Sequence, residues 1–139
     1  MKKILIIFLF MFIVISLRAE TYSVRDVTWT DLVNVTASGN NLTDLTANVW
    51  DSGAFSVEFI PENTNGYVET TINEINTHRM IGLSADNSNA SYTTIDYALY
   101  LVSNAKTYIY ENGSSLGYTG DYYASGDVVG VRRIGTTVE

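Results

Sequence analysis

The sequence predicts an all-β protein, an antiparallel β-sandwich of the jelly-roll kind. Past residue 20 the chain is rich in Thr, Val, Ile and Tyr, and turn residues recur about every 8 to 12 positions. No sustained 3.6-residue apolar period is present, which argues against helices. The single proline, Pro61, interrupts few strands. Regular short strands between turn signals are typical of sandwiches and jelly rolls.

Two segments alternate clearly in the way of half-buried strands. In 67–73, Val68, Thr70 and Ile72 share one face, and in 94–102 the face of Leu99 and Leu101 is apolar. Asn112-Gly113 predicts a tight hairpin turn because both residue types accept a positive φ. The other strands are expected at 27–35, 42–49, 53–60, 80–84, 107–111, 114–118, 126–133 and, after or around Gly135, 134–138.

The N-terminus has the pattern of an export signal. Lys2 and Lys3 precede an apolar run from Ile4 to Leu17, and small Ala19 follows as a cleavage position. We therefore expect a signal-peptide helix within 1–19 and one β-sandwich domain over 20–139. A retained N-terminal anchor is the alternative. Either outcome places the domain outside the cytoplasm, secreted or at the cell surface, with no membrane contact after signal cleavage.

The charge of the chain bears on its partners, and its cysteine content bears on the source of its stability. Cleavage after Ala19 leaves five basic and fifteen acidic residues, a net charge of −10. Such an acidic body repels phosphate backbones, so we expect no nucleic-acid partner. The chain has no cysteine, so its stability must come from a hydrophobic core rather than from disulfides.

An ordered series of segments also resembles a known type of module. The segments are 27–33, 66–69, 76–84, 94–101, 110–113 and 125–131. Together they resemble a concanavalin A-like lectin/glucanase (SPRY-like) β-sandwich module of secreted, multidomain surface proteins of Bacteroidetes-type bacteria. In such modules further strands follow the Gly-Asp-Val-Val-Gly-Val strand. The resemblance therefore implies a domain that is incomplete at its C-terminus and belongs with other domains of a longer protein.

The residues do not favour an enzyme. Glycosidases need two carboxyl groups facing one sugar, and on one strand these would stand two or four residues apart. Glu69 and Glu74 are five apart, and Pro61 separates Glu58 from Glu62. His78, the only histidine, has no motif around it, and we expect a polar surface residue.

The polar loop at 85–91 is the candidate cation site. Asp86, Asn87 and Asn89 supply oxygens that could hold calcium. The regular ligand spacing of a calcium loop is missing, and ordinary turn chemistry explains the same residues. We expect no cofactor, with calcium as the open alternative.

Aromatic side chains are the candidate ligand-binding residues, because their faces stack on the C–H faces of sugars. The candidates are Trp50, Tyr118, Tyr122 and Tyr123, with Asp121 beside them for ligand hydroxyls. Tyrosines that cap the ends of a sandwich are the other interpretation. The expectation is a non-catalytic recognition module for a glycan or a cell-surface ligand. The alternatives are a structural spacer of a larger surface protein and a polysaccharide-degrading glycosidase or lyase.

Overall fold

The computed structural model describes residues 23–46 and 49–139, and its regular secondary structure consists of antiparallel strands and one short 3₁₀ turn. The predicted signal segment, 1–19, lies outside the described residues. The elements are β1 (Trp29–Val33), β2 (Val35–Ser38), β3 (Asn41–Asp44), β4 (Gly53–Ser56), β5 (Gly66–Thr71), β6 (Arg79–Leu83), the 3₁₀ turn η1 (Tyr92–Thr94), β7 (Tyr97–Leu101), β8 (Lys106–Glu111), β9 (Ser114–Tyr122), β10 (Val128–Ile134) and β11 (Thr137–Val138). The prediction of an all-β antiparallel protein is confirmed.

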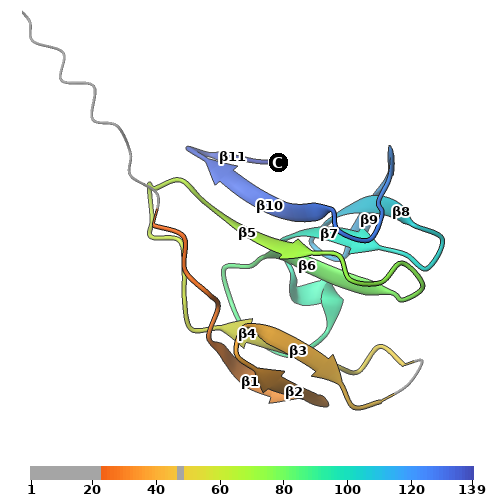
Figure 1. Cartoon of the computed structure of the whole chain (residues 1–139). Helices are drawn as coiled ribbons and strands as arrows, with labels where there is room; N and C mark the ends of the chain where they lie inside the picture. Colours follow the sequence, from red (N-terminus) through yellow and green to blue (C-terminus); the bar gives the residue numbers. More distant parts are fainter. Residues whose placement is uncertain (1–22, 47–48) are drawn as a thin grey trace, which may run out of the picture.

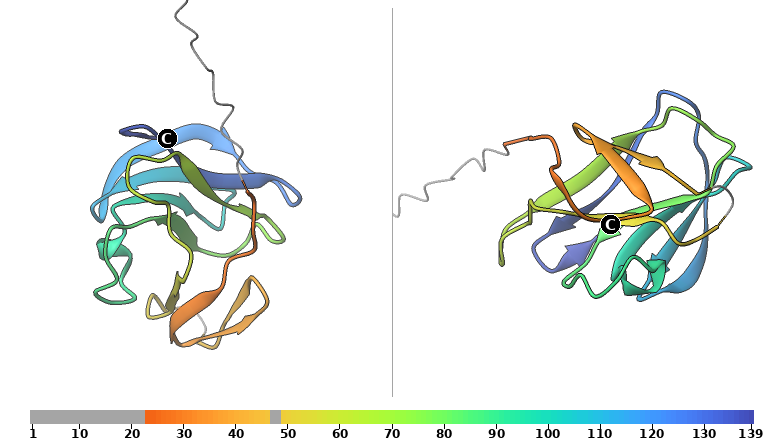
Figure 2. Two further views of the ribbon diagram at one scale, coloured as in Figure 1. Left: turned by 90° about the vertical axis from the view of Figure 1, so that its left-hand side faces the viewer. Right: turned by 90° about the horizontal axis from the view of Figure 1, so that it is seen from below.

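Two larger sheets and two hairpin-sized sheets make up the fold. The larger ones have the orders β6-β7-β8-β9 and β11-β10-β5, and β1 pairs with β4 and β2 with β3. Figure 1 shows β10 and β11 at the top, β5 beneath β10, the four-stranded sheet toward the right, and β1 to β4 at the bottom. In the left view of Figure 2, the orange β1–β3 region lies at the bottom and the blue C-terminal strands lie at the top.

The core joins the two larger sheets. Ile72, which follows β5, packs with Leu101 of β7 and Tyr123, which follows β9. Leu99 and Val129 pack around these three buried side chains. Because Leu101 and Val129 come from different sheets, burial of this cluster is what holds the sheets together.

The N-terminal strand is shorter than the alternation predicts. Instead of one strand over 27–35, the chain forms β1 and β2, with a register shift in the pairing of β1 and β4 between Thr30 and Val33. Asp31 and Asn34 both have φ of 50°. Asp and Asn tolerate this left-handed conformation better than β-branched residues do, so the break falls at these two positions.

Other boundaries also differ from the sequence prediction. β9 runs to Tyr122 rather than ending at residue 118, and β7 begins at Tyr97 because η1 occupies the segment before it. The Asn112-Gly113 turn is confirmed, with φ of 47° and 73° between β8 and β9. The backbone N–H of Asn112 also donates to the Asp96 carbonyl, which ties this turn to the start of β7.

Candidate functional site

A band of aromatic side chains covers one face of the β6-β7-β8-β9 sheet. Each ring centroid in the band lies within 6.5 Å of at least one other ring centroid of the band. The members of this aromatic stripe are Trp50, His78, Tyr92, Tyr100, Tyr108, Tyr110, Tyr118 and Tyr122. It is the largest connected group of rings among the described residues.

Strand register explains how the stripe forms. Tyr100 of β7 stands opposite Tyr108 of β8, and Tyr108 stands opposite Tyr118 of β9. Residues directly opposite one another project from the same face of a sheet. Leu99 and Leu101, the neighbours of Tyr100 in β7, project from the other face into the core. The same strands therefore supply the core on one face and the stripe on the other.

Loops complete the stripe beside β6 and β7. Trp50 precedes β4, and its ring centroid lies 5.5 Å from that of Tyr100 and 5.9 Å from that of Tyr92 in η1. His78 is exposed, as predicted, and its Nδ1 lies 2.7 Å from the Tyr100 hydroxyl, within hydrogen-bond distance. Edge-to-face contacts of this kind stabilise ring positions beyond simple area burial. They give the stripe a defined shape before any ligand binds.

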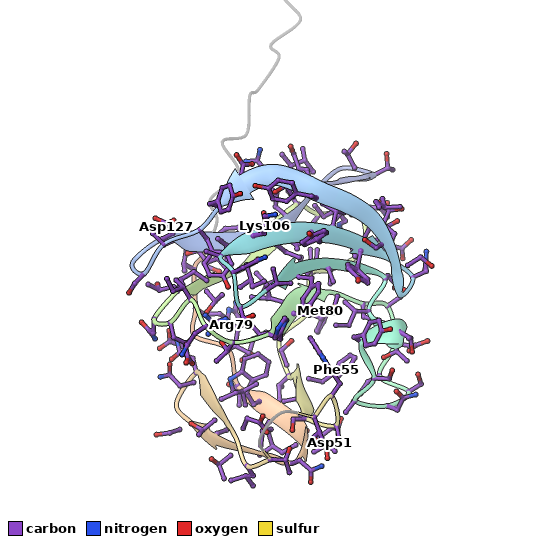
Figure 3. All side chains as sticks on the ribbon, turned by 90° about the vertical axis from the view of Figure 1, so that its right-hand side faces the viewer. Asp51, Phe55, Arg79, Met80, Lys106 and Asp127 are labelled. Atoms are coloured by element: carbon purple, nitrogen blue, oxygen red, sulfur yellow. The ribbon has the colours of Figure 1, made fainter. Side chains whose placement is uncertain are left out.

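Lys106 lies at the β9 end of the stripe. Its Nζ is 5.2 Å from the ring centroid of Tyr118 and 5.9 Å from that of Tyr122, which is cation–π distance. Figure 3 looks onto this face of the sheet, with Lys106 near the top, Met80 of β6 at the centre, and Phe55 and Asp51 below. The stripe thus carries one ammonium group at one end and an imidazole near the other.

The hydroxyls of Tyr100 and Tyr118 stay protonated at neutral pH. Burial first, and then the neighbouring Tyr110, raise the pKa of Tyr100 above its usual 10.0. Burial and then a hydrogen bond with Tyr122 raise the pKa of Tyr118 in the same direction. A neutral phenol both donates and accepts hydrogen bonds, so these groups can pair with hydroxyls of a ligand.

The structure divides the predicted ligand-binding residues between two faces. Trp50, Tyr118 and Tyr122 belong to the stripe. Tyr123 is 4% exposed and donates its hydroxyl to the Val102 carbonyl at 2.6 Å, so it belongs to the core. Asp121 alternates with Tyr122 along β9 and lines a cavity of about 380 Å³ on the core side. These two residues therefore lie away from the stripe.

Sequence reasoning missed five members of the stripe: His78, Tyr92, Tyr100, Tyr108 and Tyr110. A signal was present in β8, where Tyr108 and Tyr110 are two residues apart and therefore share a face. Its meaning depended on knowing that β7 and β9 flank β8 with tyrosines in register. That pairing follows from tertiary structure.

In the polar loop at 85–91, the candidate cation site, two asparagine side chains are engaged in hydrogen bonds. Asn87 donates its side-chain amide to the Asp31 carboxylate, and the Asn89 side-chain oxygen accepts the backbone N–H of Ser91 at 2.8 Å. Asp86 is exposed in the same loop. Within residues 23–46 and 49–139, no three His, Cys, Asp or Glu side chains gather in a group that could hold a metal ion.

Two carboxylates that sequence spacing did not pair lie close together beside β4. The Ser52 hydroxyl is 2.7 Å from Asp44 Oδ1 and 3.2 Å from Asp51 Oδ1, and the Thr46 hydroxyl also lies within hydrogen-bond distance of both. The backbone N–H of Thr46 is the first of the hydrogen bonds that lower the pKa of Asp44 below 3.8. The hydrogen bonds that Asp44 accepts from Thr46 and Ser52 hold together the loop before β4.

Comparisons with protein-family models, with curated proteins and with solved structures found no match to this chain. Among the residues that the structure describes, no helix has the length and apolar character needed to cross a membrane. The resemblance to concanavalin A-like modules therefore stays a prediction.

Proposed function

We propose that this chain is a non-catalytic, extracellular recognition module that binds carbohydrate through the aromatic stripe. The observation that carries the proposal is the connected set of eight rings on one sheet face. Ring faces pack against the apolar C–H faces of sugars, and the phenol and imidazole groups can exchange hydrogen bonds with sugar hydroxyls.

Exposure supports a binding role for this face. Trp50, Tyr92, Tyr118 and Tyr122 are all exposed large side chains. A monomeric soluble protein rarely leaves a contiguous apolar patch open to water without a binding function. Tyr and Trp also lose little conformational entropy on binding, because each has few rotatable bonds. The stripe therefore has the properties of a preformed recognition surface.

Export and sandwich architecture are parts of the same proposal. The basic and apolar start of the chain is typical of a secretory signal, and a module outside the cell meets polysaccharides and cell-surface ligands. The core cluster between the β5-containing sheet and the β7-containing sheet favours a β-sandwich. In a concanavalin A-like sandwich of this kind, the stripe would form the exposed face of one sheet.

A pair of tyrosines provides a matched test. Tyr118 of the stripe and Tyr97, on the opposite face of the same sheet, are both 39% exposed. The protein from residue 20 onward is run through native gels containing soluble polysaccharides, and any retarding ligand is titrated by calorimetry. We expect Tyr118→Ala to weaken binding roughly tenfold, the loss of about 1.4 kcal/mol. Tyr97→Ala should leave the affinity unchanged.

The alternatives give different results in the same experiment. A structural spacer would be retarded by no polysaccharide, and neither variant would differ from the parent. A glycosidase or lyase would release reducing ends or unsaturated products from the polysaccharides during the incubation. Equal losses of affinity in Tyr118→Ala and Tyr97→Ala would show that the ligand does not bind at the stripe.

A further inference from the structure

Five members of the stripe form a continuous row that crosses the sheet. The order is Trp50, Tyr100, Tyr108, Tyr118, Tyr122, and successive ring centroids are 5.5, 6.3, 5.7 and 5.9 Å apart. Three of the steps lead from one chain segment to the next, and the last stays within β9. The row therefore offers a series of similar contacts at nearly even spacing. Such a series suits a ligand with a repeating unit.

The two ends of the row are open to solvent: Trp50 is 54% and Tyr122 67% exposed, whereas Tyr100 and Tyr108 between them are half-buried. Two cavities are formed mainly by other residues, one between β9 and β10 and the other beside Tyr67 and Arg133. Of the five rings in the row, only Tyr122 contributes to either cavity. Because the rings at both ends are exposed, the ligand need not end at either of them. A polymer can extend past both ends of the row.

The rings do not form a flat platform. The planes of successive rings in the row differ by 68°, 44°, 45° and 73°. A rigid flat surface cannot stack on two neighbouring rings that are inclined to each other by such angles. A single flexible chain can rotate between its units to follow them. The geometry thus favours one soluble chain over the face of a crystalline polymer.

The charge of the protein favours neutral soluble polysaccharides over anionic ones as ligands. Lys106 is the one ammonium or guanidinium group in ring contact with the stripe among the described residues. The whole chain carries fifteen acidic and eight basic residues. Because the field of an acidic protein repels a polyanion over several ångströms, a chain of uronic acids would be disfavoured. A neutral chain avoids this repulsion.

We infer that the row binds internal units of a single, soluble, neutral polysaccharide chain. This inference rests on the proposed function and adds the class of ligand to it. Each ring stacks against one stretch of the polymer, so the contacts accumulate as the chain lengthens. The ligand needs neither a free end nor a charged group.

Chain-length dependence and ligand class test the inference together. The probes are oligosaccharides from disaccharide to octasaccharide prepared from mixed-linkage β-glucan, xyloglucan and galactomannan, together with their parent polymers. Polygalacturonate and alginate serve as anionic polymers, and microcrystalline cellulose and chitin as crystalline ones. We expect affinity for at least one neutral series to rise at least tenfold with length and then level off. Anionic and crystalline polymers should bind at least tenfold more weakly.

Substitutions in the row test the class of ligand separately from the proposed carbohydrate-binding function. Trp50→Ala and Tyr122→Ala remove opposite ends of the row, and each should shorten the oligosaccharide length at which affinity levels off. Tyr97→Ala, on the other face, is the control. If binding needs Tyr118 but is strongest for a polyanion, a crystalline surface or a disaccharide, the function stands and the inference is overturned. If no probe shows binding that depends on Tyr118, both are overturned.

Discussion

Tyr122 and Tyr123 are neighbours in the chain but lie on opposite sides of the sheet. Tyr122 is 67% exposed and contacts Tyr118 in the stripe, whereas Tyr123 is 4% exposed and packs with Ile72 and Leu101. The two-residue period of a strand explains the difference, because successive side chains point to opposite faces. Residue type alone therefore says little about the role of a tyrosine in this protein.

Removing the hydroxyl group of Tyr122 or of Tyr123 should change the free energy of unfolding by different amounts. Tyr123→Phe loses a buried hydrogen bond to the Val102 carbonyl, and such a bond contributes about 0.5–1.5 kcal/mol. The Val102 carbonyl still accepts the Ala105 N–H at 2.9 Å, so we expect a loss near the lower end of that range. Tyr122→Phe, the exposed control, should change the free energy of unfolding by less than about 0.5 kcal/mol. Urea denaturation measures both, and equal losses would contradict the assignment of Tyr123 to the core.

At the scale of elements, the β8–β9 hairpin positions most of the row. Asn112 and Gly113 form its turn with positive φ at both residues, which matches the right-handed twist of the paired strands. A Cβ placed on Gly113 would lie 2.8 Å from the Cα of Thr93, at the middle of η1. The turn therefore lies tightly against η1, whose Tyr92 contacts Tyr110 of β8.

Two glycine substitutions separate backbone strain from this close contact. Gly39 has a φ of 61° and no heavy atom within 4 Å of an added Cβ. Gly39→Ala should therefore cost only the left-handed strain, about 1–2 kcal/mol. Gly113→Ala should cost roughly a further 1–3 kcal/mol, because its Cβ overlaps Thr93. Thermal or urea unfolding compares the two, and equal costs would show that η1 moves away from the turn without resistance.

At the scale of the whole molecule, the buried residues are concentrated in the two larger sheets and the segments next to them. Among residues 23–46 and 49–139, the buried ones all lie from Ile72 to Val131, and none of the residues of β1, β2, β3 and β4 is buried. Hydrogen bonds such as that from the Thr28 N–H to Glu58, at 2.7 Å, hold the N-terminal region together instead. Regions with few buried apolar contacts open at lower free energy than the core.

Native-state hydrogen exchange should show this unevenness. We expect the paired amides of β2 and β3 to exchange at least roughly tenfold faster than those at the centres of β7 and β8. The reason is that the β2–β3 hairpin can open without exposing Ile72 or Leu101. Equal protection in both regions would mean that the whole chain unfolds as one cooperative unit. Mass spectrometry or NMR at neutral pH makes the measurement.

The sequence by itself determined those features that depend on near neighbours. Alternation over 67–73 and 94–102 predicted strands, and Asn112-Gly113 predicted the hairpin turn. Both signals are local, since the strand period and a positive φ are properties of a few adjacent residues. Even here Asp31 and Asn34 broke an expected strand, because their left-handed backbone overrode the alternation around them.

Tertiary structure alone decided which residues meet. Trp50 reaches Tyr100 from a separate loop, and Tyr108 lies between Tyr100 and Tyr118 only because β7, β8 and β9 pair in that register. Asp44 and Asp51 likewise come together through folding of the segment before β4. Register depends on contacts between strands that are distant in the chain, and shifting it by one residue would exchange the two faces of a strand. The pattern within each strand therefore predicted two faces, and only the pairing between strands decided that one would hold the core and the other the stripe.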